Sequence, residues 1–398
     1  MPLDLDLTAS AVVDDPYPYF AAARTDAPVQ WHDGLGMWLT FTHAAANAVL
    51  RSRSLGRLWS PRDPAQPMPF FELIHVNSLL ENEPPTHTRL RRLVAGAFAR
   101  GHVERLRPRI AELADRLASD VAEAGAEGGI VDLIPLYAEP LPVQVIAELL
   151  GVPESDWPLL RPWSNAIVKM YEYAVTDAQR EAAERASREF VEYLRDLVAR
   201  RRTQPGEDLV TSLIAETDAH GTRLSEDELV TTCTLLLNAG HEATVNVVGN
   251  GMTALLTHGD QLSRLRADPA LVPGAVEELI RFDSPLQLFE RTATADTEVA
   301  GVLVESGTKI AALLGAANRD PAVFAEPERF DVARADNPHL GFGAGIHFCV
   351  GAPLARVELQ ASLATLLRRF PALALAEPPQ RRPEFVIRGV RSLPVTVH

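Results

Sequence analysis

The clearest pattern along the chain is a series of amphipathic segments. In residues 103–125 and 178–202, apolar side chains recur every three or four positions and charged residues occupy the opposite face. This spacing is typical of surface helices. Residues 135–160 show a similar pattern that Pro140, Pro142 and Pro153 interrupt. We therefore expect a chain built mainly of helices.

A longer helix is predicted to begin at Ser225. Ser225 and Glu228 have the spacing of a capping box, in which each side chain accepts a backbone hydrogen bond from the other residue. No proline follows until after Gly259. At 1.5 Å per residue, such a helix would be on the order of 50 Å long.

Strand-like segments are few and lie late in the chain, at residues 299–304, 309–314 and 391–397. Residues 55–86 are rich in proline and lack a clear period, which is typical of a long loop that acts as a lid or a binding segment. No change in composition marks a linker. The prediction is one domain over residues 1–398, mainly α with a minor β portion.

Composition restricts the classes of partner. The net charge of −15 argues against nucleic-acid binding. No apolar stretch approaches the roughly 20 residues that span a membrane, and the N-terminal segment has early acidic residues in place of the basic start of a signal peptide. We expect a cytoplasmic protein.

The two cysteines, Cys233 and Cys349, occupy very different surroundings. They lie far apart in a chain without an export signal, so we expect no disulfide between them. Cys233 is set in the apolar sequence TTCTLLLNAG, which predicts a buried small side chain. Cys349 lies in FGAGIHFCVGAPLAR, residues 342–356, where glycines precede and follow it and a helix is expected next.

The loop around Cys349 favours a thiolate that faces a flat ligand. Glycine permits a positive φ and a close approach of the backbone to such a ligand, while N–H groups in a tight loop before a helix stabilise a thiolate. The glycine spacing is not that of a dinucleotide-binding loop, and no second cysteine or histidine stands at zinc-ligand spacing.

The segment resembles the signature F-G-x-G-x-H-x-C-x-G-x-x-L-A-R of the cytochrome P-450 superfamily at every specified position. This resemblance implies haem b (iron protoporphyrin IX, heme), held between a long central helix and the cysteine loop. It makes Cys349 the metal ligand to the haem iron and places His347 against a haem propionate. Phe342, Gly343 and Gly351 are the further cofactor-binding residues of this loop.

Other cationic residues are candidates for binding the propionates. His87 and Arg91 are four residues apart, which taken alone is typical of a solvated helix face. The resemblance implies that both hold haem carboxylates, with Arg291 as a third propionate ligand. Arg89 and Arg92 are expected to face solvent, where they could dock an acidic electron donor.

Glu278 and Arg281 are three residues apart in AVEELIRF and can pair on one helical face. Taken alone, such a pair is typical of an exposed surface. The resemblance to the family's E-x-x-R helix and P-E-R-F element implies a buried charge network of Glu278, Arg281 and Arg329 that braces the cysteine side of the haem.

The long helix carries the candidate oxygen chemistry. Leu236, Ala239, Ala243 and Val247 form one stripe beside Gly240. The sequence resembles the family's A-G-x-[DE]-T element, which implies that Ala239 and Gly240 lie against the haem and that Glu242 supplies protons. Taken alone, Glu242 could face a solvated groove.

The catalytic candidates Glu242, Ala243 and Thr244 include a departure from the family pattern. The family has threonine directly after the acid, where this chain has Ala243. Thr244 lies one residue later and is turned by 100° around the helix, so it cannot simply replace the missing hydroxyl.

The resemblance implies a monooxygenase that inserts one atom of O2 into a small or medium hydrophobic substrate. Its electrons would come from a separate ferredoxin and an NAD(P)H-dependent ferredoxin reductase, and we expect a monomer. Ala243 leaves oxidative coupling or peroxide-driven oxidation open, and a non-catalytic haem protein is a further alternative. The residues expected to line the substrate pocket, each of which is typical of ordinary core when taken alone, are Phe70, Phe71, Leu236, Leu286, Leu288 and Val390.

Overall fold

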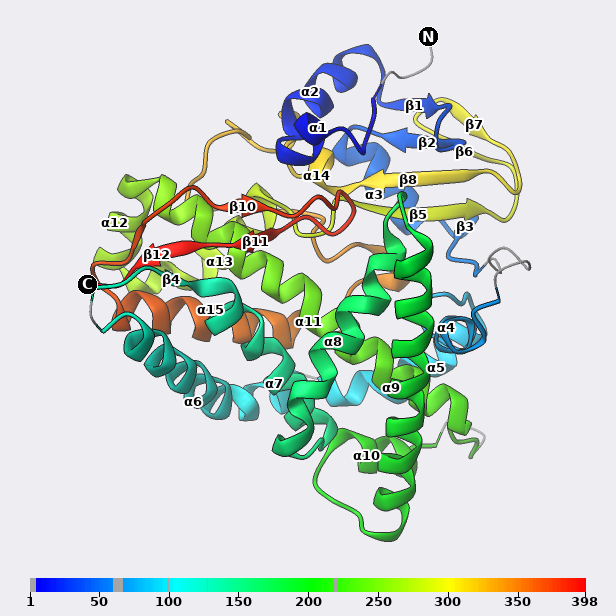
Figure 1. The fold of residues 1–398 in the computed structure, drawn as a ribbon. Helices are drawn as coiled ribbons and strands as arrows, with labels where there is room; N and C mark the ends of the chain where they lie inside the picture. Colours follow the sequence, from blue (N-terminus) through cyan, green and yellow to red (C-terminus); the bar gives the residue numbers. More distant parts are fainter. Residues whose placement is uncertain (1–4, 60–66, 99, 127, 218–220) are drawn as a thin grey trace. The chain divides into compact units, whose positions relative to one another are not determined.

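The computed structural model describes residues 5–59, 67–98, 100–126, 128–217 and 221–398 (Figure 1). The chain folds into two compact units, and each combines segments that are far apart in the sequence. The first unit contains residues 1–56, 107–140 and 243–398, and the second contains residues 57–106 and 141–242. The prediction of one domain remains a prediction.

The first unit contains all the strands that the described residues form. Its helices are α1 (Ser10–Asp14), α2 (Tyr17–Asp26), α3 (His43–Arg51), α12 (Gly259–Ala267), α13 (Val272–Phe282), α14 (Leu314–Ala317) and α15 (Ala352–Arg369). Its strands are β1 (Val29–His32), β2 (Met37–Thr40), β3 (Leu55–Gly56), β4 (Val131–Asp132), β5 (Leu288–Ala293), β6 (Thr297–Val299), β7 (Val302–Val304), β8 (Lys309–Leu313), β9 (Ala374–Leu375), β10 (Gln380–Arg381), β11 (Val390–Ser392) and β12 (Pro394–Thr396).

The largest sheet has the strand order β1-β2-β8-β5-β3. Strands β2 and β8 run parallel, and the other neighbours are antiparallel. Apolar side chains of this sheet pack against α3, with Val49 and Ile310 fully buried in the shared core. The smaller sheets are β4-β12-β9, β10-β11 and β6-β7.

The second unit is helical. Its helices are α4 (Pro69–Val76), α5 (Thr86–Ala95), α7 (Pro140–Leu150), α8 (Trp157–Val168), α9 (Asp177–Thr203) and α10 (Leu209–Ala215). Helices α8 and α9 lie side by side (Figure 1), and the rings of Trp163 and Phe190 stack between them at 5.3 Å. Glu184 of α9 accepts hydrogen bonds from the backbone N–H groups of Phe70 and Phe71, which caps the start of α4.

Two helices, α6 (Arg100–Ala124) and α11 (Glu226–Thr257), run through both units. They confirm the predicted helix at residues 103–125 and the predicted long helix. The capping box before α11 is present: Ser225 N–H donates to Glu228 at 2.9 Å, and Glu228 N–H donates to the Ser225 hydroxyl at 3.1 Å.

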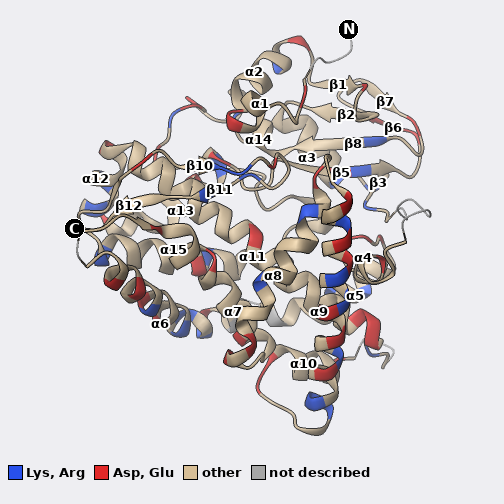
Figure 2. Ribbon diagram, in the orientation of Figure 1, with Lys and Arg blue, Asp and Glu red and all other residues tan. Residues whose placement is uncertain are grey.

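Helix α9 confirms the amphipathic pattern of residues 178–202. Thr176 and Gln179 form a capping box at its start, and Arg200, Arg201 and Arg202 lie in its last turn, where positive charge is favourable. Figure 2 shows both signs of charge along its length. Among the helices of the described residues, none combines the length and apolar character that a membrane span requires.

Two parts of the secondary-structure prediction were wrong. Residues 55–86 are not one continuous loop, because α4 forms at Pro69–Val76, although residues 60–66 lie outside the described residues. Strands also occur early in the chain, as β1 and β2, and β5 at Leu288–Ala293 was missed. These short strands are specified by pairing across the sheet, which local sequence does not reveal.

Glu358 of α15 gives the first unit a distinctive dependence on pH. The residue is 2% exposed, and its Oε1 has no hydrogen-bond partner among the described residues. Burial raises the pKa of this carboxyl to about 8, from an ordinary value of 4.5. The folded protein therefore holds this proton more tightly than the unfolded chain does, and its stability falls as the pH rises between these two values.

We expect Glu358→Gln, which cannot ionise, to remove this loss. The free energy of unfolding of the variant relative to the wild type should increase by about 3–4 kcal/mol between pH 5 and pH 8. Urea unfolding followed by circular dichroism at several pH values measures this difference. If the free energies of unfolding of the wild type and the variant change in parallel across that pH range, Glu358 does not have a raised pKa.

Candidate functional site

The loop before α15 has a backbone that only glycine allows at two positions. Gly343 and Gly345 have φ values of +69° and +71°. A Cβ atom on Gly345 would lie 2.4 Å from the carbonyl oxygen of Leu50, so any side chain there would displace the backbone of α3. The N–H of Cys349 donates to the carbonyl oxygen of Phe342 at 2.9 Å, which closes the loop.

The two cysteines differ as the sequence predicts. Cys233 is fully buried, and burial raises the pKa of its thiol to about 12, so it remains a neutral core side chain. Cys349 is exposed and lies three residues before the start of α15. Its neighbours Ile346 and Phe348 are exposed apolar side chains. An accessible thiol in a glycine-rich loop suits ligation of a metal centre.

The cysteine loop is joined to α13 by a charged cluster that the sequence analysis missed. Glu277 accepts hydrogen bonds from Arg356, at 2.8 Å, and from His339 at 3.1 Å. Partial burial raises the pKa of Glu277, but the hydrogen bonds from Arg356 and His339 outweigh it and lower the pKa to about 2. The guanidinium of Arg356 also lies 4.4 Å from the ring centre of Phe342, so the cluster fixes both ends of the loop.

The adjacent residue, Glu278, forms a second cluster. The Glu278 and Arg281 side chains are fully buried and share two hydrogen bonds of 2.7 and 2.8 Å. This confirms their predicted pairing on one helical face. Arg281 also donates to the carbonyl oxygens of Asn318 and Pro327, so its charge is well solvated by the protein.

The prediction that Arg329 is the third member of this network was wrong. The side chain of Arg329 is 54% exposed and pairs with Glu326, and only its backbone carbonyl reaches Arg281. The second arginine on Glu278 is Arg334, whose Nε lies 3.1 Å from the carboxylate. Both arginines come from the same long segment after α14, so the resemblance identified the correct segment and the wrong side chain.

We expect Arg281→Ala to destabilise the protein by about 3–5 kcal/mol, because it leaves the Glu278 charge buried with less compensation. Arg329→Ala is the matched control: it removes an exposed pair and should change stability by less than about 1 kcal/mol. Urea unfolding midpoints and the yield of folded protein measure both effects. Equal losses in the two variants would refute the arrangement described here.

The middle of α11 contains the candidate catalytic residues. Glu242 and Thr244 are each 4% exposed, whereas Ala243 between them is only half-buried. Thr244 thus faces different surroundings from Ala243, as the 100° rotation predicts. The carboxylate of Glu242 lies 3.8 Å from Nδ1 of His241, which in turn lies 3.3 Å from the hydroxyl of Ser164.

An open strip runs along this otherwise buried part of α11. Ala239 is exposed and Gly240 half-buried, while Leu236 and Val247 are buried. A Cβ atom on Gly240 would lie 2.8 Å from the side chain of Ile146 on α7, so close helix packing accounts for this glycine. Small residues leave the strip accessible, which fits the predicted approach of a flat cofactor.

The candidate propionate ligands lie on several elements. His87 is buried and Arg91 half-buried on α5 of the second unit. In the first unit, Arg291 is buried on β5 and donates to the carbonyl oxygen of Glu290 at 2.8 Å, and His347 is half-buried in the turn Gly345–His347. Their convergence on one cofactor remains a prediction.

The sequence predicted that Arg89 faces solvent and is available to dock a partner, but the structure shows otherwise. Arg89 forms an ion pair with Glu228, the capping residue of α11. Arg92 is exposed, as predicted. The basic surface available on α5 is therefore smaller than the sequence suggested.

The expected pocket residues differ in burial. Phe71 is fully buried, with its ring centre 4.1 Å from that of His75, and Val390 packs against Gly249. Leu236 and Leu288 are also buried, whereas Phe70 and Leu286 are half-buried. Contact with a substrate remains a prediction for all six.

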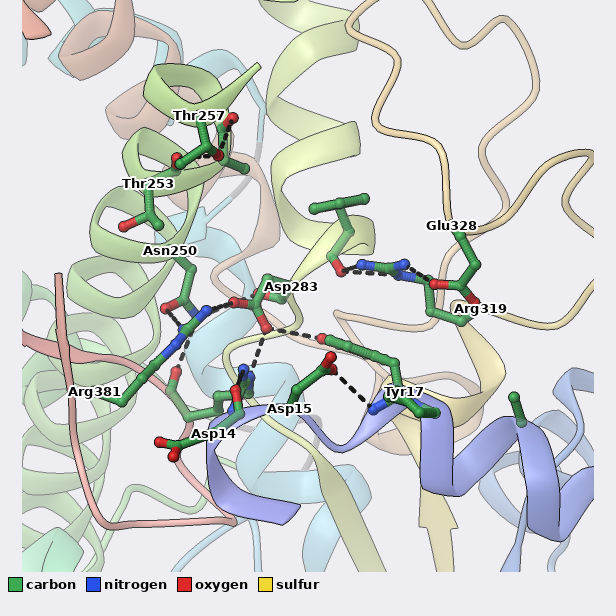
Figure 3. A pocket seen from close by; sticks show the side chains of 15 residues that line it. Asp14, Asp15, Tyr17, Asn250, Thr253, Thr257, Asp283, Arg319, Glu328 and Arg381 are labelled. Carbon is green, nitrogen blue, oxygen red and sulfur yellow. Dashed lines mark hydrogen bonds and ion pairs between the residues drawn. The ribbon is translucent and has the colours of Figure 1, made fainter. Parts of the chain in front are cut away.

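A separate groove of about 580 Å³ lies in the first unit (Figure 3). Asp283 is its central group: it accepts hydrogen bonds from Tyr17, at 2.8 Å, and Arg388, at 2.6 Å, and pairs with Arg381. Burial raises the pKa of Asp283, but Arg388 and Arg381 outweigh it and hold the pKa far below its usual value. These interactions join three distant segments, and no residue of the cysteine loop lines the groove.

Comparison with known proteins adds an independent line of evidence. The family model described as Cytochrome P450 matches residues 65–389. The chain is 40% identical to cytochrome P450 monooxygenase PikC of Streptomyces venezuelae, over 99% of this chain and 94% of the relative. It is 39% identical to 6-deoxyerythronolide B hydroxylase of Saccharopolyspora erythraea, over 98% of both proteins. The crystal structure of P450BioI in complex with an acyl carrier protein superposes with a TM-score of 0.92, at 33% identity over 98% of this chain and all of that one.

Proposed function

Since the chain belongs to the cytochrome P450 family and is a P450 monooxygenase, we propose that it inserts one atom of O2 into a small or medium hydrophobic organic molecule. The observation that carries this proposal is the exposed Cys349 thiol, held in a glycine-rich loop that two charged clusters support. We further propose that residues 1–398 act as one cytoplasmic, monomeric catalytic domain.

The residues present fit the haem iron that the family carries. We propose haem b as the form of haem, with Cys349 as the residue that would bind the iron. Gly343 and Gly351 would permit a close approach of the loop to the haem. Ala239 and Gly240 present a strip of α11 without large side chains. His87, Arg91, Arg291 and His347 would supply positive charge or hydrogen bonds to the propionates.

When bound, a thiolate-ligated haem supplies the activation of O2. The chain itself positions the substrate, limits the access of water and supplies protons. Glu242 is suited to the last task because its carboxyl is buried in mid-helix beside His241, where an acid without a role would be costly.

Ala243 is the specific observation that supports a second candidate function. No side-chain hydroxyl stands at this position to hold a proton or a water molecule. Oxidative coupling or peroxide-driven oxidation does not require the same proton delivery, so both remain alternatives.

If this chain is the oxygenase component only, a separate protein must supply its electrons. We propose a ferredoxin with its NAD(P)H-dependent reductase. The exposed Arg92 on α5 supports docking of an acidic protein. Separately, the exposed Ile346 and Phe348 beside Cys349 offer apolar contact area.

The names of the relatives support a hydrophobic substrate without identifying one. They include a nocardicin C N-oxygenase and a vitamin D(3) 25-hydroxylase, which are 41% and 39% identical to this chain. A solved structure at 28% identity is in complex with testosterone. We propose a substrate in the same broad class of hydrophobic organic molecules.

Turnover under ¹⁸O2 tests the proposed reaction. With ferredoxin, reductase and NADPH, a compound that shifts the haem spectrum should gain one labelled oxygen atom, and peroxide alone should give a lower rate.

Ala243→Thr restores the family's hydroxyl, so it should increase the amount of product formed per NADPH consumed. Faster turnover with peroxide in the wild type would contradict the monooxygenase proposal.

A further inference from the structure

A small cavity in the second unit lies between α4, the turn Lys169–Tyr171 and α11. Its volume is about 10 Å³, which is room for one water-sized group. Polar and apolar side chains both line it: Ile74, His75, Ser78, Leu80, Glu81, Tyr171, Thr234, Leu235 and Asn238.

Asn238 is the unusual member of this lining. It is 5% exposed, and its Oδ1 has no hydrogen-bond partner among the described residues. A buried acceptor without a partner costs about 1–3 kcal/mol. A group that enters the cavity and donates a hydrogen bond would remove this cost.

The rest of the wall is held in place before any ligand enters. His75 contacts the carbonyl oxygen of Phe71 at 2.6 Å and the hydroxyl of Tyr171 at 3.1 Å. Its ring also stacks on Trp59, at 4.6 Å between centres. The Thr234 hydroxyl donates to the carbonyl oxygen of Val230, so its oxygen can still accept a hydrogen bond.

The size and charge of the cavity restrict the group that it can take. A carboxylate or an ammonium group would lose most of its hydration in so small a space, and the only acidic residue of the lining, Glu81, already pairs with Arg57. A hydroxyl has nearly the size of a water molecule and both donates and accepts hydrogen bonds.

The cavity also shares α11 with the candidate catalytic residues. Asn238 directly precedes Ala239 and lies one helical turn before Glu242. The four residues from Asn238 to Glu242 correspond to about 6 Å along the helix. A substrate anchored at Asn238 would therefore extend along the open strip of α11.

We infer that Asn238 is a specificity-determining residue, and that its buried carboxamide accepts a hydrogen bond from a hydroxyl group of the substrate. The substrate is thus a hydrophobic alcohol rather than a plain hydrocarbon or an acid. This inference rests on the proposed function, because it assigns a substrate class to the same site.

Matched pairs of compounds test the inference. Equilibrium dialysis of the holoenzyme measures the dissociation constants of cyclododecanol and cyclododecane, 1-adamantanol and adamantane, and testosterone and androst-4-en-3-one. The wild type should bind the alcohol of at least one pair about five-fold more tightly than the deoxy compound, the ratio expected for one neutral hydrogen bond. Asn238→Leu, and Asn238→Ala as a second variant, should reduce that ratio to about one.

Thr232→Val is the matched control. Thr232 is fully buried on the same helix, and its hydroxyl also lacks a hydrogen-bond partner among the described residues, but it does not line the cavity. This variant should keep the preference for the alcohol. The inference is overturned if the wild type shows no preference for the alcohol or binds no alcohol at all. It is also overturned if the preference survives in both Asn238 variants. In either case the cavity holds only water.

The haem absorption band of each preparation separates this result from the proposed function. A preparation without that band argues against the proposed function, whereas the dialysis ratios report on Asn238 alone. A haem band with unchanged ratios in the variants rejects the role of Asn238 and leaves the monooxygenase proposal in place.

Discussion

The buried contact between Glu278 and Arg281 is the interaction on which the candidate site depends most. An isolated charge in a protein interior would be very costly, so each member requires the other and the backbone groups around them. The carbonyl oxygens that solvate Arg281 belong to the segment that leads into the cysteine loop. The neighbouring Glu277 holds the end of that loop through Arg356. Two consecutive glutamates on α13 therefore fix the surroundings of Cys349.

The second constraint is the use of small and polar residues in the middle of α11. Ala239 and Ala243 keep one strip of the helix accessible, whereas Glu242 and Asn238 place polar groups beside it. Gly240 has a simpler explanation than the family resemblance suggested, because Ile146 occupies the space of a Cβ atom. The same helix thus provides close packing and, in our proposals, also proton supply and substrate recognition.

The sequence predicted those features that depend on local pattern. Helices α6, α9 and α11 follow from periodicity and capping, and the Glu278–Arg281 pair follows from its spacing on a helix. Arg334 was missed because its contact with Glu278 joins residues far apart in the sequence, and spacing cannot reveal such a contact. Strands β1, β2 and β5 were missed for the same reason. The proline-rich sequence around α4 concealed a helix whose start Glu184 caps from α9.

The proposed function depends above all on binding of a haem iron by the Cys349 thiolate. The carbon monoxide difference spectrum of the reduced, undenatured protein tests it most directly, with Cys349→His as the comparison. We expect the wild type to show the long-wavelength Soret band of thiolate-ligated haem, and the variant either to show the shorter-wavelength band of imidazole ligation or to bind no haem. A wild-type protein without the long-wavelength band, or a variant that retains it, would show that Cys349 is not the iron ligand.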